Sequence, residues 1–364
     1  KRMTMSLPLD EDGACPAWML PNAGGKGYWR YDLDLLGWRL LADQFGALKP
    51  GEALTAVDSA MASFEAGRID IGSLMAIIEA GSRRDDRRIV GAAAGALGDL
   101  AKLVREDAEA REIARQEMIR IFGPRLDMVD LESTSLEPDA EPAEESEDTR
   151  ILRSMLERYL AREANEPELR ASFVSAAGAF VGMAGMRSDR VLNSDDFSTA
   201  FAIAVQDLGE PFIDALMAQR NEIDDPVFAL AIAYALGENR DPALSERVLN
   251  IALSGELGPR ESYTIVNGQM REPQVEAVAW DWLQLNFQQF VTVIPAQRKL
   301  STPGLASSFC YPGAVDELEL MFDRMGRLAP GYERALSESV ERIELCVALQ
   351  DEKSDEVIAF FKQR

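Results

Sequence analysis

Apolar residues recur with the 3.6-residue period of an α-helix almost without interruption from Leu35 to Phe361, and this pattern constrains the fold more than any other feature. N-cap residues, first-turn prolines and glycines beyond helix ends divide the pattern into segments separated by short polar connections. The expected helices are 35–48, 50–66, 71–82, 87–105, 107–122, 149–163, 166–185, 196–208, 210–221, 226–237, 242–254, 260–267, 273–292, 314–327, 333–349 and 354–363. We therefore predict a mainly α fold, an α-helical superhelix of antiparallel helix pairs, solenoid-like but without a strict sequence repeat.

The first 33 residues differ from the rest because they alternate with the period of a β-strand. The expected strands are 3–9, 17–21 and 27–33, and the turn-rich residues 22–26 join the last two in a hairpin. Strands of this number and length are not stable alone in water, so we expect them to pack on the helices or to belong to a larger sheet. This predicts a small N-terminal β element over 1–33 and an α-helical domain over 34–364.

Acidic residues outnumber basic ones by 62 to 38, which gives the chain a net charge of -24. Nucleic acids and anionic membranes need a basic protein face, so we expect neither as a partner. The segment 127–148 is rich in acids, contains no Lys or Arg and includes Pro138 and Pro142. This composition is typical of a solvated loop, and we expect a surface insertion rather than an acidic docking segment.

The sequence contains no histidine, so the base or metal ligand of several common hydrolytic sites is missing. A Ser-His-Asp or Cys-His nucleophile and every His-ligated zinc site are thereby excluded from this chain. Cys15, Cys310 and Cys346 are too few and too scattered for a zinc site made of cysteines alone. We expect no catalytic residue, no metal ligand and no cofactor within the chain.

Cys310 precedes the expected helix 314–327, and Cys346 lies near the end of the expected helix 333–349. If these helices are antiparallel neighbours, the two cysteines lie close enough for a disulfide, which would fit a periplasmic or secreted protein. Two separately buried thiols in a cytosolic protein are the alternative. The sequence alone decides neither whether Cys310 and Cys346 form a disulfide nor in which compartment the protein lies.

Two further patterns are expected to serve packing rather than ligand binding. Gly91 and Gly95 have the small-xxx-small spacing that permits close approach of a neighbouring helix. Trp280, Leu283 and Phe287 fall on one face of the expected helix 273–292, as core residues do.

Several short strings, in order along residues 15–350, resemble passages of the M1 family of zinc aminopeptidases. The segment 17–30 resembles W-x-x-x-N-x-x-x-x-G-Y-Y-R, residues 145–153 resemble E-S…L-R, residues 276–287 resemble G-R-x-x-A-W-x-F-L-x-x-N-W, and residues 335–343 resemble x-L-x-Q-x-x-E-x-I. The matching residues, whose expected role is structural or at a domain junction, are Trp18, Asn22, Gly27, Tyr28, Arg30, Glu145, Arg153, Trp280, Asn286 and Glu341.

The resemblance implies that residues 1–33 end a β-sandwich domain and that the rest is the C-terminal helical domain of a metalloaminopeptidase. It implies a zinc ion in a preceding catalytic domain that lies outside this chain. This chain would then be inactive alone. That catalytic domain and peptide substrates are the implied partners, because the helical domain would close the active-site chamber. An Arg suits the distal carboxylate of a peptide better than a Lys, although the sequence does not single one out. The alternative is a free-standing α-solenoid scaffold that binds a protein partner.

Overall fold

The computed structural model describes residues 18–134, 146–183, 185, 187, 188 and 191–364. Within these ranges every regular element is a helix, and the helices pack in pairs, which confirms the prediction of a mainly α fold. The chain divides into two compact units. Unit 1 contains the residues up to Ala164 together with Lys353–Arg364, and unit 2 contains Asn165–Glu352.

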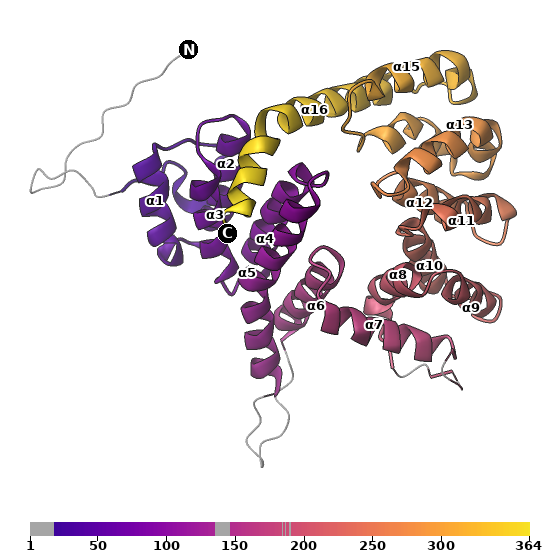
Figure 1. Ribbon diagram of the computed structural model, residues 1–364, viewed down its shortest axis with the longest axis horizontal. Coiled ribbons are helices and arrows are strands. Elements are labelled where there is room, and N and C mark those ends of the chain that lie inside the picture. The colour runs from indigo at the N-terminus through magenta and orange to yellow at the C-terminus, as the bar shows by residue number, and fades with distance from the viewer. Residues whose placement is uncertain (1–17, 135–145, 184, 186, 189–190) are drawn as a thin grey trace, which may run out of the picture. The chain divides into compact units, whose positions relative to one another are not determined.

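Unit 1 is built from two rows of helices (Figure 1). Helices α1, α3 and α5 pack side by side in one row, and α2, α4 and α6 form the other. Their bounds are α1 Leu35–Asp43, α2 Pro50–Glu65, α3 Ile71–Ser82, α4 Arg87–Leu103, α5 Ala108–Thr134 and α6 Glu147–Arg162. The predicted starts of α1, α3 and α4 are set by Asp34, Asp70 and Asp86, whose carboxylates accept hydrogen bonds from first-turn amides. Large side chains such as Trp38, Phe64 and Phe122 are fully buried between the rows.

Unit 2 repeats this organisation. Helices α8, α10 and α12 form one row, α11, α13 and α15 form the other, and α7 packs on α8. Proline occupies the first position of α7, α10, α11 and α12, where its missing N–H costs nothing and its fixed φ favours the helix. The bounds are α7 Pro167–Phe180, α8 Phe197–Leu208, α9 Glu210–Arg220, α10 Pro226–Gly237, α11 Pro242–Ser254, α12 Pro259–Gln269, α13 Glu276–Val293, α14 Ala296–Lys299 and α15 Ala314–Met325.

The last helix, α16 (Glu333–Lys362), is shared by the two units. Its residues up to Glu352 belong to unit 2, and its final turns from Lys353 onward belong to unit 1. Within unit 2, Cys346 on α16 forms a disulfide with Cys310, which precedes α15, and the two Cα atoms are 5.4 Å apart. The sequence predicted two helices, 333–349 and 354–363, where the structure has one. The helix continues because Lys353, Val357 and Phe361 repeat every fourth residue and are all buried.

The predicted N-terminal strands are wrong for the residues that the structure describes. Residues 18–33 contain only a short 3₁₀ helix at Ala23–Gly25, and the expected strand 3–9 lies outside the described residues. The backbone groups that a strand would need have other partners. The Asn22 side chain bonds both the N–H and the C=O of Gly27, the Gly24 N–H donates to Glu52, and the Tyr31 N–H donates to Ser59.

The acidic segment 127–148 is also less of a loop than predicted. Helix α5 runs through Pro124 to Thr134, and α6 begins at Glu147 after its N-cap Ser146, while residues 135–145 lie outside the described part. Pro124 removes one intrahelical hydrogen bond, but Leu126 and Val129 continue the buried face. Packing of that face therefore outweighs the local helix-breaking signal.

Candidate functional site

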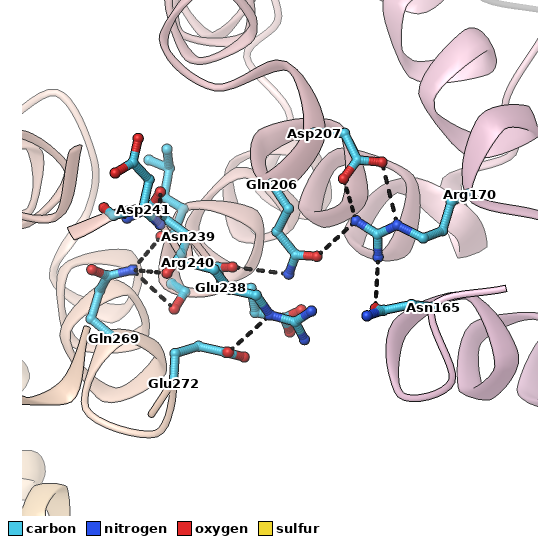
Figure 2. Close-up of polar contacts among 12 residues, drawn as sticks. Asn165, Arg170, Gln206, Asp207, Glu238, Asn239, Arg240, Asp241, Gln269 and Glu272 are labelled. Carbon is cyan, nitrogen blue, oxygen red and sulfur yellow. Dashed lines mark hydrogen bonds and ion pairs between the residues drawn. The ribbon is translucent and has the colours of Figure 1, made fainter. Parts of the chain in front are cut away.

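A connected group of polar side chains in unit 2 lies where helices of one row end. Because α8, α10 and α12 pack side by side, the residues that close them come together at one edge (Figure 2). We call this group the helix-end cluster. Its members are Asn165, Arg170, Gln206, Asp207, Glu238, Asn239, Arg240, Asp241, Gln269 and Glu272.

Arg170, from the first turn of α7, begins the cluster. Its guanidinium contacts both carboxylate oxygens of Asp207, with Nε to Oδ2 at 3.3 Å, and also donates to Gln206 at 3.2 Å and to Asn165 at 3.5 Å. The side chain is only 12% exposed, so these partners hold a nearly buried positive charge.

Further along the row the contacts repeat from helix to helix. Gln206 donates to the carbonyl of Glu238 at 3.0 Å, and Arg240 Nε donates to Glu272 at 3.1 Å. Each of these pairs spans 32 residues, so the cluster follows the spacing of successive helix pairs. Helix C-termini carry partial negative charge, which favours arginines at this edge.

Gln269 anchors the middle of the cluster and is completely buried. Its Nε2 donates to the carbonyls of Leu236, Gly237 and Asn239 at the end of α10, and its Oε1 accepts from Ser245 Oγ at 2.6 Å. One side chain thereby satisfies backbone acceptors that the end of α10 would otherwise leave without partners.

An open pocket of about 560 Å³ lies beside the cluster. Arg170 and Arg240 line it together with the polar groups of Asn165, Gln206 and Asp207, and the apolar residues Pro167, Ala171 and Val174 complete it. Asn165 has a φ of +54°, and it is the one non-glycine residue with positive φ in the part of the chain that the structure describes. Asn adopts this conformation more readily than other non-glycine residues, and here it follows the end of α6. Two planar guanidinium groups beside an apolar wall suit a carboxylate attached to an apolar body.

The residues predicted from the N-terminal motif lie in unit 1 and serve its architecture. Asn22 and Gly27 close the loop described above, and Arg30 forms a bidentate ion pair with Asp58 on α2. Trp18 is partly exposed, and the Tyr28 ring is fully exposed.

The other predicted residues are spread over several helices. Arg153 lies on α6 of unit 1, and Glu145 lies outside the described residues. Trp280 is buried against Phe309, as expected of a core residue, and Asn286 donates to the Trp282 carbonyl one turn earlier. Glu341 lies exposed on α16. Neither these residues nor the two cysteines belong to the helix-end cluster.

Sequence reasoning missed Arg170, Arg240 and their partners. A signal existed, because polar residues recur 32 residues apart at the ends of successive helices, as in the pairs Gln206 and Glu238 and Arg240 and Glu272. Within the described residues, no group of His, Cys, Asp and Glu side chains is arranged to hold a metal ion, and none of the helices is both long and apolar enough to cross a membrane.

Comparison with known families identifies one match. Residues 18–345 match the model of the ERAP1-like C-terminal domain, so the match includes the N-terminal loop, most of both units and the first part of α16. Comparison with curated proteins gives no match. The helix pairs of both units agree with the match. The chain therefore belongs to the ERAP1-like C-terminal domain family, the C-terminal helical domain of M1 aminopeptidases.

Proposed function

We propose that this chain is the non-catalytic C-terminal part of an M1-type metalloaminopeptidase, where it closes the active-site chamber and helps to bind peptide substrates. The match over residues 18–345 supports the proposal. Zinc and the catalytic groups would lie in a separate catalytic domain, which is the proposed partner.

The observation that carries the proposed role in substrate binding is the pocket beside the helix-end cluster. Arg170 and Arg240 line it, and their present partners are side-chain carboxylates of Asp207 and Glu272. A peptide's C-terminal carboxylate has the same chemistry and would compete for the same forked donors. The apolar wall of Pro167, Ala171 and Val174 would take the neighbouring side chain of the peptide.

A second observation supports a partner for unit 1. Large apolar side chains are exposed along its N-terminal segment and the start of α1, which is unusual for a surface left in water. They are Met19, Tyr28, Trp29, Leu35 and Leu36, exposed by between 51% and 107%. We assign this surface to contact with the preceding part of the parent enzyme.

The test compares the parent enzyme with its Arg240→Gln variant on a ten-residue peptide, the same peptide with an amidated C-terminus, and a single-residue aminoacyl reporter. We expect kcat/KM for the free-acid peptide to fall about tenfold, the value of one charge-assisted hydrogen bond. The amidated peptide and the reporter should be cleaved at unchanged rates. Arg342→Gln, on an exposed residue of α16, is the matched control.

An equal loss of kcat/KM on all three substrates would show that Arg240 acts through stability. An unchanged kcat/KM on the free-acid peptide would show that the helix-end cluster does not contact the substrate. Deleting residues 35–364 should likewise impair peptide cleavage more than reporter cleavage. The rival function, a free-standing scaffold, is distinguished by the coding sequence upstream of Lys1. An H-E-x-x-H segment in the same polypeptide supports the aminopeptidase, and its absence supports the scaffold.

A further inference from the structure

A second pocket, in unit 1, is separate from the helix-end cluster and has a different composition. It has a volume of about 390 Å³ and lies between the end of α3 and the middle of α5. Three arginines, Arg83, Arg120 and Arg125, line it with a single carboxylate, Glu79. We call it the arginine pocket. Three arginines around one carboxylate are notable in a chain whose net charge is -24.

The carboxylates near the arginine pocket are already shared among several arginines. Glu79 contacts Arg120 at 2.6 Å, Arg364 at 3.8 Å and Arg83 at 3.9 Å. Glu117 contacts Arg120 at 2.9 Å and Arg364 at 3.7 Å. Among the residues that the structure describes, two carboxylates thus serve these three arginines, which leaves an excess of positive charge beside the pocket.

Arg125, which also lines the arginine pocket, has incomplete hydrogen bonding. Its side chain is 7% exposed, and within the described part of the chain its Nη2 forms an ion pair with Asp85 at 3.1 Å. Asp85 is itself 94% exposed, so water competes strongly for that carboxylate. The Arg125 Nε is buried and has no hydrogen-bond partner among the described residues. A buried guanidinium with an unused donor is costly unless something completes its hydrogen bonding.

The rest of the arginine pocket is apolar. Ile121, Pro124 and Met128 on α5 line it beside the arginines, and Ser82 contributes its hydroxyl group at the end of α3. The Ser82 hydroxyl donates to the Glu79 carbonyl, which satisfies its only donor. The wall would shield a carboxylate from water, which strengthens its attraction to the guanidinium groups.

From these observations we propose that the arginine pocket is a binding site for a small organic carboxylate that carries an apolar body. The carboxylate takes the place of Asp85 on Arg125 and approaches Arg83 and Arg120, and the apolar body lies against Ile121, Pro124 and Met128. The site lies wholly within unit 1 and is independent of the role proposed for the helix-end cluster.

The experiment is a titration of the full 364-residue chain, followed by ligand-observed NMR, with four probes in separate samples. Benzoate has both a carboxylate and an apolar ring, acetate and inorganic phosphate have charge without the ring, and benzyl alcohol has the ring without charge. We expect saturable benzoate binding with a Kd of about 1 mM or tighter, weakened by salt, and at least about tenfold weaker binding of the other three.

Two variants attribute the binding to Arg125. Arg125→Met should weaken benzoate binding at least about tenfold, because the forked donor is lost. It should not lower the unfolding temperature, because an apolar chain of similar length removes the buried Nε that has no partner and loses only an ion pair to the exposed Asp85. Asp85→Asn should strengthen binding about threefold by freeing Arg125 from its competitor. Arg334→Met, whose side chain is 91% exposed on α16, is the control and should change nothing.

Three outcomes would overturn the proposal. They are benzoate binding that does not saturate, benzoate binding by Arg125→Met that is as tight as by the unaltered chain, and phosphate binding that is as tight as benzoate binding. The last result would indicate a general anion site without the apolar component. Asp85→Asn keeps the test decisive if Arg125→Met does not fold, because an exposed carboxylate contributes little to stability.

Discussion

Single buried polar side chains hold the loops and helix ends of this protein, and Glu52 on α2 is the strongest case in unit 1. The residue is 9% exposed, and its carboxylate accepts hydrogen bonds from the Gly24 N–H at 2.7 Å and the Lys49 N–H at 2.8 Å. The bond from Gly24, and then that from Lys49, lowers the pKa of Glu52 below its ordinary value. Glu52 thereby joins the 22–27 loop to the start of α2.

We expect Glu52→Gln to destabilise the protein by roughly 2 kcal/mol at pH 7, because the hydrogen bonds lose their charge. A lowered pKa in the folded state means that the carboxylate stabilises the fold above its unfolded pKa. That contribution disappears as pH falls through the folded value, so the difference between the two proteins should shrink below about pH 4. Urea unfolding at pH 7 and at pH 3.5 measures it. A difference that does not change with pH would contradict this account.

Gln269 has the corresponding role in unit 2, where it bonds three carbonyls at the end of α10 and the Ser245 hydroxyl. Gln269→Leu keeps the bulk but leaves these groups buried without partners. We expect a loss of about 3 kcal/mol in the free energy of unfolding, measured in urea. Gln288→Leu on the exposed face of α13 is the control and should change stability by less than about 0.5 kcal/mol. A similar effect of both substitutions would mean that the hydrogen bonds at the end of α10 contribute nothing.

At the scale of elements, two glycines allow α10 and α12 to pack closely. A Cβ on Gly268 would lie 2.6 Å from the Gly237 Cα and 2.7 Å from its carbonyl oxygen, all of it backbone that cannot move aside. Gly268→Ala should therefore force these helices apart and lower the free energy of unfolding by about 2 kcal/mol. Gly95→Ala on α4 is the matched control, because nothing lies within 4 Å of its would-be Cβ. It should stabilise the protein by up to about 1 kcal/mol. Equal effects on thermal unfolding would refute close packing as the cause.

The sequence predicted where the helices lie better than it predicted how they pack. Helical periodicity and proline-led starts predicted most helices within a few residues, because both are local properties. The packing role predicted for Gly91 and Gly95 is only partly right. Gly91 faces the Met155 sulfur atom of α6, whereas Gly95 faces open space. Spacing identifies a face of a helix but not what covers it, and Pro124 within α5 shows that tertiary packing can override a local signal.

The candidate site was beyond prediction for a related reason. Arg170 and its partner Asp207 are 37 residues apart, and Arg240 and Glu272 are 32 apart. They lie on or just after the ends of helices that meet only in the folded unit. With 38 basic and 62 acidic residues, most such pairs are solvated surface charges, so composition does not identify these four. The N-terminal motif identified the family but not the side chains that line either pocket.

At the scale of the whole molecule, the end of the chain completes the first unit. The last turns of α16 pack into unit 1, where Val357 and Phe361 are completely buried and Glu356 accepts a hydrogen bond from the first amide of α3. The Lys353 ammonium lies 4.8 Å from the centre of the Phe64 ring, and Lys362 pairs with Asp107 at 2.6 Å. The core of unit 1 therefore includes side chains from residues 353–364, which follow unit 2 in the sequence.

We expect Phe361→Ala to lower the free energy of unfolding of unit 1 by about 4 kcal/mol, because it leaves a cavity in a closed core. Phe360→Ala on the same turn is the matched control and should cost less, because Phe360 is only partly buried. Hydrogen exchange followed by mass spectrometry can assign the loss to each unit. Amides of α2, α3 and α5 should exchange faster in Phe361→Ala, while those of α8, α10 and α12 keep their protection, because unit 2 has a core of its own. Uniformly faster exchange in both units would mean that they unfold as one, and α16 would then transmit stability along its whole length.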